Sequence, residues 1–327
     1  MPELNVDSFK AYDIRGRVPD VLSSSVAYAL GRAYATFLNP ESVVVGHDIR
    51  LSSPEICGSL IEGLLDSGVN VSHIGCCGTE EIYFSTDHYG FDGGIIVTAS
   101  HNPGDYNGMK LVREKSRPIS SESGLIDIKE LVRKNSFPSL NPDKKGTLSF
   151  FSHREDYVRK ILEFISIEQT RGFKILANAG NGAAGPVLET LREHLECELI
   201  VINGEPDGNF PNGVPNPLLP ENRRPTENAV KEVQADFGVA WDGDFDRCFF
   251  FDETGRFVEG YYIVGLLAQA LLEEKPAETI IYDSRLTWNT IDMVGSLGRT
   301  VQSKAGHSFI KEKLRLENAI YGGEMSG

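Results

Sequence analysis

The sequence predicts an α/β protein of two or three domains, on the basis of its strand–helix alternation and its length. Short β-branched runs recur along the chain, and segments with helical periodicity separate them. This alternation is typical of parallel βαβ units. The 327 residues agree with two or three domains, at roughly 100 to 200 residues for each domain.

Seven runs are predicted to form strands. Several are continuously apolar, as expected for strands that are buried on both faces of a sheet. The predicted strands span residues 42–46, 69–75, 94–98, 173–177, 199–202, 237–241 and 279–282. The predicted helices span residues 22–37, 53–67, 185–196, 263–274 and 307–316. Pro54 and Pro186 support two of the helix starts, because proline is tolerated in the first turn of a helix.

Two breaks divide the chain. Residues 135–146 (N-S-F-P-S-L-N-P-D-K-K-G) are polar and contain proline, which is typical of a linker. The sequence D-E-T-G at 252–255 indicates a hairpin turn between runs at 248–251 and 256–258. The predicted domains are therefore 1–145, 146–250 and 251–327.

Composition and charge exclude some classes of function. The net charge of −15, from 32 basic and 47 acidic residues, argues against a surface that binds nucleic acid or an anionic membrane. No apolar run reaches about 18 residues, so no transmembrane helix is predicted, and residues 1–10 lack the apolar core of a signal peptide. The five cysteines form no C-x-x-C pair, which favours reduced thiols in a cytoplasmic protein.

Polar segments with side chains that can bind ligands or take part in catalysis follow five of the predicted strands. Ligands gather at the carboxyl ends of strands in α/β sheets, so these segments are the candidate site. They read G-H-D-I-R, T-A-S-H-N-P-G-D-Y-N-G-M-K, A-N-A-G-N-G-A-A-G, D-G-D-F-D-R and D-S-R. Residues 203–225, rich in Pro, Gly and Asn, are long for a connection and are predicted to be an ordered or functional excursion.

The segment D-G-D-F-D-R at 242–247 predicts a metal site. Its three carboxylates repel one another unless a cation joins them. In an extended segment alternate residues share a face, so Asp242, Asp244 and Asp246 would converge. Oxygen ligands without His or Cys suit Mg²⁺ better than Zn²⁺. A solvated acidic turn is the alternative, against which Phe245 and the apolar run 248–251 argue.

The segment T-A-S-H-N-P at 98–103 offers Ser100 as a candidate nucleophile in a turn after a strand. On this segment alone, a structural S-x-x-P turn is an equal alternative. The chain lacks G-x-S-x-G, which disfavours a hydrolase triad. The run A-N-A-G-N-G-A-A-G at 177–185 lacks the spacing expected for dinucleotide binding.

Two further groups of residues suit an anionic sugar. Cationic side chains next to strand ends or Gly turns can grip an anion, although each alone is also expected of an ordinary surface. They are Arg15, Arg17, Arg50, Lys110, Arg247, Arg285, Lys304 and His307. In G-G-E-M-S-G at 322–327, Glu324 and Ser326 could bind sugar hydroxyls, although a plain turn is the simpler interpretation.

Taken together, these segments resemble the α-D-phosphohexomutase family. Five motifs match in the family's order: A-Y-D-I-R-G at 11–16, T-A-S-H-N-P at 98–103, D-G-D-F-D-R at 242–247, K-A-G-H at 304–307 and G-E-M-S-G at 323–327. Residues 283–290 and Met325 look most like the bacterial phosphomannomutases or dual phosphomannomutase/phosphoglucomutases within it. The resemblance implies three consecutive mixed-sheet α/β domains, the third incomplete and the fourth absent, because the family continues after G-E-M-S-G.

The resemblance also implies roles for individual residues. Ser100 would be the phosphoserine, and Asp242, Asp244 and Asp246 would hold Mg²⁺ together with a phosphate oxygen on Ser100. The implied catalytic residues are Ser100, His101, Lys110, Arg15 and Arg247. The implied substrate-binding residues are Tyr12, Arg285, Lys304, Gly306, His307, Glu324 and Ser326. The general base stays open among Lys110, Arg15 and His101.

The implied reaction interconverts mannose 6-phosphate and mannose 1-phosphate through a hexose 1,6-bisphosphate, which is also the activator, and feeds GDP-mannose and surface polysaccharide synthesis. The expected partner is a small phosphosugar, with no nucleic acid and no membrane, and the chain is expected to be a monomer or weak dimer. The alternatives are a phosphatase, a phosphoglucomutase, a phosphoglucosamine mutase, or a sugar-phosphate-binding module with impaired catalysis. Ala305 departs from the family, which usually has Thr there.

Overall fold

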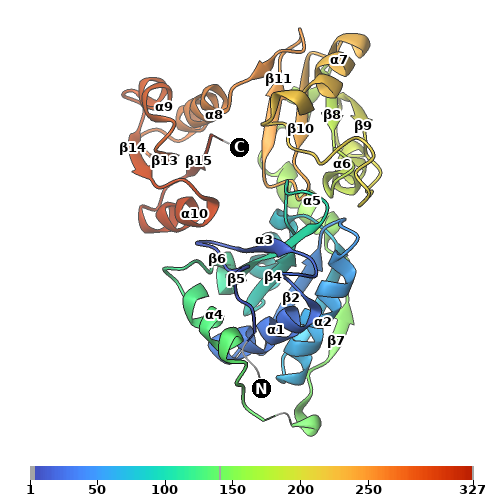
Figure 1. Cartoon of the computed structure of the whole chain (residues 1–327). Helices are drawn as coiled ribbons and strands as arrows, with labels where there is room; N and C mark the ends of the chain where they lie inside the picture. Colours follow the sequence, from blue (N-terminus) through green and yellow to red (C-terminus); the bar gives the residue numbers. More distant parts are fainter. Residues whose placement is uncertain (1–3, 140, 326–327) are drawn as a thin grey trace.

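The computed structural model of the chain describes residues 4–139 and 141–325. Figure 1 shows three α/β units, of which the first lies below and the second and third lie side by side above it. The seven predicted strands and five predicted helices all form, with ends shifted by four residues or fewer. The prediction of a three-domain α/β fold is thus confirmed, with mixed sheets in the first and second domains. No helix in the described ranges is long and apolar enough to cross a membrane.

The first domain contains a mixed sheet with the strand order β1-β5-β4-β2-β3-β7. Strands β2, β3, β4 and β7 are parallel, whereas β5 runs antiparallel to both β1 and β4, and β6 pairs with β5. Its strands are β1 (Ile14–Arg17), β2 (Ser42–His47), β3 (Asn70–Cys76), β4 (Gly93–Val97), β5 (Tyr106–Arg113), β6 (Arg117–Pro118) and β7 (Leu148–Phe150). Its helices are α1 (Ser24–Leu38), α2 (Ser53–Asp66), α3 (Thr79–His88) and α4 (Leu125–Lys134), with 3-10 turns η1 (Glu114–Ser116) and η2 (Pro142–Lys144).

The second domain contains a sheet with the order β12-β11-β10-β8-β9. Strands β8, β9 and β10 are parallel, and β11 and β12 add an antiparallel hairpin. The strands are β8 (Lys174–Asn178), β9 (Glu198–Ile202), β10 (Phe237–Trp241), β11 (Cys248–Phe251) and β12 (Phe257–Val258). The helices are α5 (Arg154–Leu162), α6 (Ala184–Arg192) and α7 (Arg224–Val233), with 3-10 turns η3 (Ile167–Thr170) and η4 (Pro220–Asn222).

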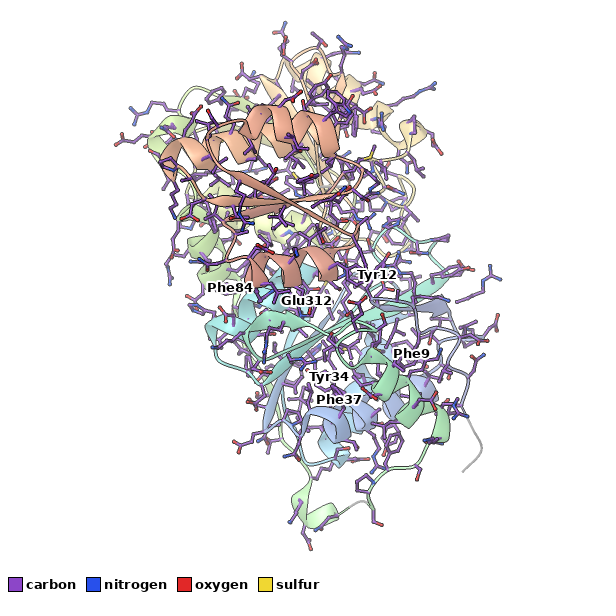
Figure 2. The ribbon with its side chains drawn as sticks, turned by 90° about the vertical axis from the view of Figure 1, so that its left-hand side faces the viewer. Phe9, Tyr12, Tyr34, Phe37, Phe84 and Glu312 are labelled. Atoms are coloured by element: carbon purple, nitrogen blue, oxygen red, sulfur yellow. The ribbon has the colours of Figure 1, made fainter. Side chains whose placement is uncertain are left out.

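The third domain contains a parallel sheet with the order β14-β13-β15. Its strands are β13 (Thr279–Asp283), β14 (Arg299–Ser303) and β15 (Tyr321–Gly323). Its helices are α8 (Gly260–Glu274), α9 (Thr287–Val294) and α10 (His307–Leu316). Figure 2 shows α10, marked by Glu312, facing the first domain, with Tyr12 close to the junction.

The sheets extend a few residues past the domain boundaries predicted at 145 and 250. Strand β7 follows residue 145 and pairs with β3 in the first sheet. Strand β12 follows residue 250 and pairs with β11 in the second sheet. Both extensions have one cause: the chain completes a hydrogen-bonded edge before it leaves a domain, and a change in composition does not mark where that pairing ends.

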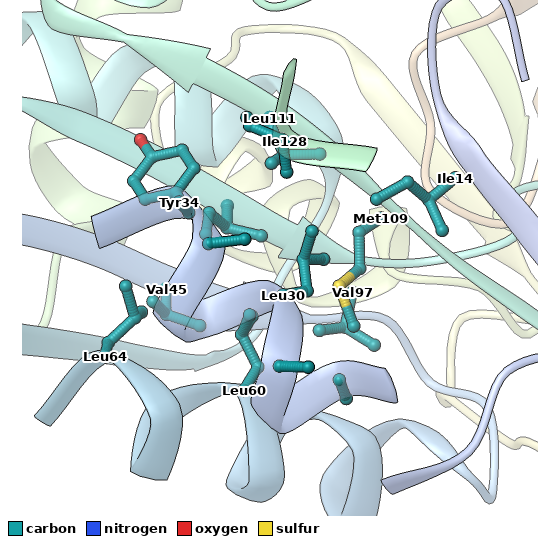
Figure 3. Packing of buried hydrophobic residues seen from close by; sticks show 14 of the residues in the cluster. Ile14, Leu30, Tyr34, Val45, Leu60, Leu64, Val97, Met109, Leu111 and Ile128 are labelled. Carbon is teal, nitrogen blue, oxygen red and sulfur yellow. The ribbon is translucent and has the colours of Figure 1, made fainter. Parts of the chain in front are cut away.

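The core of the first domain forms where α1 and α2 pack on the sheet. On β2 the side chains alternate, so Val43 and Val45 join this core while Val44 faces a smaller cluster on the other side. Figure 3 shows Leu30 and Tyr34 of α1 with Leu60 and Leu64 of α2 in this core. Helix α1 is bounded by Ser23, which accepts from Val26 N–H at its start, and by Asn39 in a left-handed conformation at its end.

Two glycines let helices α1 and α2 approach at backbone distance. A methyl group on Gly63 would lie 2.1 Å from the backbone oxygen of Tyr28, and one on Gly31 would lie 2.3 Å from the backbone oxygen of Leu60. Real carbon atoms do not approach oxygen so closely, so an alanine at either position would force the helices apart.

Gly63→Ala should therefore lower the free energy of unfolding by about 1–3 kcal/mol, because overpacking a tight contact costs that much. Gly58→Ala is the matched control on the same helix, since nothing lies within 4 Å of its added methyl group. This control should stabilise the protein by about 0.5–1 kcal/mol through helix propensity. Urea denaturation measures both changes, and equal effects at the two positions would contradict the close contact.

Candidate active site at the junction of three domains

Ser100 lies buried in the turn that follows β4 and faces the second domain. Its backbone is left-handed, with φ of 51°, which is costly for a residue other than glycine. The Oγ hydroxyl makes a short contact with Asp242 Oδ2 and lies 2.9 Å from His101 Nδ1. Gly243 packs against the Ser100 carbonyl, where an added methyl group would lie 2.7 Å from the oxygen. The serine turn and the D-G-D-F-D-R loop are therefore fitted to each other.

The three aspartates converge as predicted, although by a different geometry. One oxygen from each of Asp242, Asp244 and Asp246 can be chosen so that all three lie within 4.8 Å of one another. The loop is a tight turn rather than an extended segment, because Phe245 N–H donates to Asp242 O at 3.1 Å and Phe245 has φ of 44°. The expectation that alternation along an extended strand brings the carboxylates together is thus wrong, and the turn brings them together instead.

The first domain supports this aspartate loop. Thr79, at the start of α3, donates its hydroxyl to Asp244 Oδ2 at 2.6 Å and its backbone N–H to Asp244 O at 3.0 Å. The Phe245 ring packs so closely on Gly78 that a side chain there would collide with it. Sequence analysis missed Thr79, for which the only available signal was its place just after a strand.

Lys110 projects from β5 into the acidic loop and is almost completely buried. Its Nζ lies 2.7 Å from Asp244 Oδ2, 2.5 Å from Asp246 Oδ2 and 3.0 Å from Thr79 Oγ1. Burial alone would lower the pKa of Lys110, but the charges of Asp244 and Asp246 outweigh it and raise that pKa. Burial likewise acts to raise the pKa of Asp244, but the Lys110 ammonium outweighs it and lowers that pKa.

The remaining oxygens of the loop suit a hard cation. Asp244 Oδ1 and Asp246 Oδ1 are buried and have no hydrogen-bond partner within the described ranges. Burial, followed by the charges of Asp244 and Asp246, raises the pKa of Asp242. Unpartnered carboxylate oxygens without His or Cys fit Mg²⁺ in both charge and ligand type.

His101 and Arg247 lie next to the serine hydroxyl. Arg247 Nη1 lies 3.1 Å from His101 Nδ1, and the Arg247 backbone N–H donates to Asp242 Oδ1 at 3.2 Å. A guanidinium can only donate, so Nδ1 of His101 acts as an acceptor in this contact. Arg15 is linked to the serine turn through Asn102 instead. Its Nη1 donates to Asn102 Oδ1 at 2.6 Å, and its Nη2 donates to Asp13 Oδ2 at 2.6 Å.

A cleft of about 290 Å³ opens beside the acidic loop, and all three domains line it. Tyr12 and Glu80 come from the first domain, and Leu218, Asp246 and Arg247 come from the second. The third domain contributes Arg285, Ala305, Gly306, His307, Ile310, Lys311, Leu314, Gly322 and Glu324. Leu218 belongs to the segment 203–225, so this segment is ordered and reaches the cleft.

Hydrogen bonds and ion pairs hold polar side chains of the third domain in place inside this cleft. Glu324 Oε1 accepts from Gly306 N–H at 2.6 Å and lies 3.6 Å from Arg285 Nη2. Burial raises the pKa of Glu324. Arg285 is in turn held by Asp283, whose Oδ2 lies 2.6 Å from Arg285 Nη2. The Tyr12 ring meets the His307 ring edge-on, with centroids 5.7 Å apart.

One of the predicted substrate-binding residues, Lys304, stands apart from this cleft. Lys304 is exposed and its Nζ lies 3.1 Å from Glu122 Oε1 of the first domain. It is absent from the cleft lining found among the described residues. Ser326 lies outside the described residues.

Comparisons with known proteins agree across the chain. Family models described as phosphoglucomutase/phosphomannomutase, alpha/beta/alpha domains I, II and III, match residues 6–139, 155–255 and 259–327. A phosphomannomutase from Escherichia coli is 54% identical over 323 residues, which cover 97% of this chain and 71% of that protein.

Two further relatives extend the comparison. A protein named phosphohexose mutases from Xanthomonas campestris is 54% identical over 326 residues, covering 99% of this chain and 72% of that protein. The crystal structure of a phosphoglucomutase/phosphomannomutase family protein from Burkholderia thailandensis superposes with a TM-score of 0.91 at 35% identity. That match covers 99% of this chain and 72% of the other.

His307 makes the stability of the site depend on pH. Both of its ring nitrogens are buried without a hydrogen-bond partner among residues 4–139 and 141–325. Burial, together with the charges of Lys311 and Lys110, lowers the pKa of His307 well below its usual value. Because the folded-state pKa is lowered, the neutral ring favours the folded state above pH ~6.5, and this contribution is lost as the pH falls.

Between pH 7 and pH 5 the wild type should lose up to about 1.4 kcal/mol per pH unit more stability than His307→Gln, because only the wild type takes up this proton on unfolding. Urea unfolding at several pH values measures the two slopes. His194→Gln, at an exposed position, is the control and should keep the wild-type slope. Identical slopes for wild type and His307→Gln would show that His307 is not held neutral.

Proposed function

Because the chain belongs to the phosphoglucomutase/phosphomannomutase family of phosphohexomutases, which are isomerases, we propose that it interconverts mannose 6-phosphate and mannose 1-phosphate through a phosphorylated Ser100. One observation carries this proposal: the Ser100 hydroxyl contacts a buried loop of three aspartates beside a cleft lined by basic side chains. Phosphoryl transfer depends chiefly on positioning and charge neutralisation, and this arrangement is suited to both.

The first half-reaction moves the phosphoryl group from Ser100 to the sugar. The bond between phosphorus and Ser100 Oγ breaks, and a bond forms between phosphorus and a free sugar hydroxyl, which gives a hexose 1,6-bisphosphate. The sugar hydroxyl loses its proton and Ser100 Oγ gains one. The second half-reaction reverses these changes at the other phosphate after the bisphosphate turns over in the cleft, and it restores phosphorylated Ser100.

The contacts of Lys110, Arg15 and His101 distinguish among these three candidates for the general base. Lys110 is a poor base, because two aspartates hold its ammonium and raise its pKa. Arg15 is engaged as a donor by Asn102 and Asp13. His101 Nδ1 lies 2.9 Å from Oγ, so we assign His101 to the proton on the serine side.

The sugar side needs a different group, because an in-line transfer places the sugar hydroxyl opposite Oγ. His307 lines the cleft, its two ring nitrogens have no hydrogen-bond partner among the described residues, and its lowered pKa keeps the ring neutral. We assign it to the proton of the sugar hydroxyl.

Asp242, Asp244 and Asp246 would hold Mg²⁺, which when bound supplies positive charge to the transferring phosphoryl group. Arg247, which lines the cleft between Asp246 and His101, adds a second positive charge from the protein. Glu324 and Arg285 are placed to bind the sugar and its phosphate.

The name phosphomannomutase for the Escherichia coli relative supports mannose phosphates as substrates. We further propose that the product mannose 1-phosphate feeds GDP-mannose and surface polysaccharide synthesis. The broader name of the Xanthomonas campestris relative supports other hexose phosphates as second substrates of the same site, and the description of the family models supports glucose phosphates among them.

Ser100→Ala should abolish phosphoryl carriage and lower mutase activity at least about 1,000-fold, since no other group can take the nucleophile's place. Asp244→Asn should raise the Mg²⁺ concentration needed for half-maximal activity by about 10- to 100-fold. A coupled mannose 1-phosphate assay with trace glucose 1,6-bisphosphate measures activity, and an intact-mass spectrum measures the phosphoryl group. Ser72→Ala, on β3 of the first sheet, where its hydroxyl lies 3.2 Å from Ser149 Oγ, is the control. Full activity in Ser100→Ala would sink the assignment.

A further inference from the structure

The backbone of Ser100 is held on both sides by residues that do not touch its hydroxyl. Its N–H donates to Thr98 Oγ1 at 2.9 Å, and its carbonyl accepts from Arg50 Nη2 at 2.8 Å. A left-handed serine persists only where surrounding contacts over-determine it. These two hydrogen bonds fix the two peptide groups that flank the Ser100 Cα, and with them the direction of the Cα–Cβ bond.

Arg50 is only 1% exposed and donates to four backbone carbonyls of the serine turn. Its Nη2 bonds the carbonyls of Ser100 at 2.8 Å and Asn102 at 2.6 Å. Its Nη1 bonds those of Pro103 at 2.6 Å and Tyr106 at 3.0 Å. All four N–H groups on the two Nη atoms are therefore engaged in hydrogen bonds. A single planar guanidinium thus binds the backbone of the turn from Ser100 to the start of β5.

Asp48 links this guanidinium to Thr98. Its Oδ2 lies 3.2 Å from Arg50 Nε, an ion-pair contact, and accepts from Thr98 Oγ1 at 2.8 Å. Its Oδ1 accepts from Ser53 Oγ at 2.5 Å and from Arg50 N–H at 3.0 Å. One carboxylate after β2 thus orients both residues that hold the Ser100 peptide.

The second domain covers this cluster. The Phe210 ring centroid lies 5.4 Å from the Arg50 guanidinium, and the same ring is the nearest neighbour of Gly104 in the serine turn. Gly208 packs on the backbone of Ile49 and Leu51, where a methyl group would lie 2.3 Å from the Ile49 oxygen. The second domain thereby helps to shield the Arg50 guanidinium and its hydrogen bonds from solvent, which strengthens those bonds.

We infer that Arg50 is a positioning residue for phosphoryl transfer, which sets the rate of transfer at Ser100 Oγ through the backbone of the serine turn. It touches neither the hydroxyl nor the cleft, so it should leave substrate affinity unchanged. This inference rests on the proposed function, because it assumes that Ser100 carries the phosphoryl group. Lysine cannot replace arginine here, since one ammonium cannot present four N–H groups in a plane.

The test uses the half-reaction in which the full chain is loaded from glucose 1,6-bisphosphate. In that step a sugar O–P bond breaks, a P–Oγ bond forms, and the Ser100 proton passes to the sugar oxygen. Quenched samples analysed by intact mass give the rate constant and the half-saturating concentration. Arg50→Lys should lower the rate constant roughly 30- to 100-fold, the size of effect that a displacement of about 1 Å produces. The half-saturating concentration should stay within about threefold, since the cleft is untouched.

Arg32→Lys is the matched control. Arg32 is also buried, donates to the carbonyl of Pro138 at 2.6 Å and lies 5.0 Å from the Phe137 ring, but it is remote from the serine turn. Its replacement should lower the melting temperature without changing the loading rate. An equal loss of rate in both variants, or a folded Arg50→Lys protein that loads within threefold of the wild-type rate, would overturn the inference.

Thr98 provides a second test that does not depend on the folding of Arg50→Lys. Thr98→Val removes the hydroxyl that joins Asp48 to the Ser100 N–H and should lower the loading rate about tenfold, whereas Thr98→Ser keeps the hydroxyl and should restore it. Equal rates for Val and Ser would contradict the positioning role. If the wild type itself is never loaded, the proposed function fails instead, so the two failures are distinguishable.

Discussion

The burial of three carboxylates in one turn is the constraint on which the site depends. Asp242 and Asp244 are fully shielded from solvent, and such charges are costly unless opposite charge and hydrogen bonds surround them. The structure meets this requirement from two domains: Lys110 and Thr79 come from the first, and Arg247 comes from the loop itself. Electrostatics therefore draws the first and second domains together at the point where Ser100 stands.

The second domain contributes a network of asparagine amides at the carboxyl edge of its sheet. Asn178 Oδ1 accepts from Asn203 Nδ2 at 2.9 Å, and Asn212 Nδ2 donates to both Asn181 at 2.9 Å and Asn203 at 3.0 Å. These bonds order the start of the 203–225 segment, which carries Phe210 to Arg50 and Leu218 to the cleft. The long connection at 203–225 thus forms part of the site.

The sequence predicts much of this arrangement, because strand-ending segments with unusual chemistry are visible without coordinates. The Asp242–Asp246 loop and the Ser100 turn were found in this way. Strand β5, which carries Lys110, was not among the predicted strands, since Asn107 and Gly108 interrupt the apolar pattern that would reveal it. The burial of the Arg50 side chain could not be predicted. In the sequence, an arginine that follows a strand gives the same pattern whether its guanidinium faces water or binds four carbonyls.

The cover that Phe210 places over Arg50 has a consequence for the order in which the molecule assembles. Residues of the first domain supply the hydrogen bonds described for the backbone of the serine turn, but the second domain supplies the dry surroundings that make those bonds strong. During synthesis the first domain emerges earlier and meets water at this surface. The hydrogen bonds that hold the left-handed serine therefore reach their full strength only when the later segment docks.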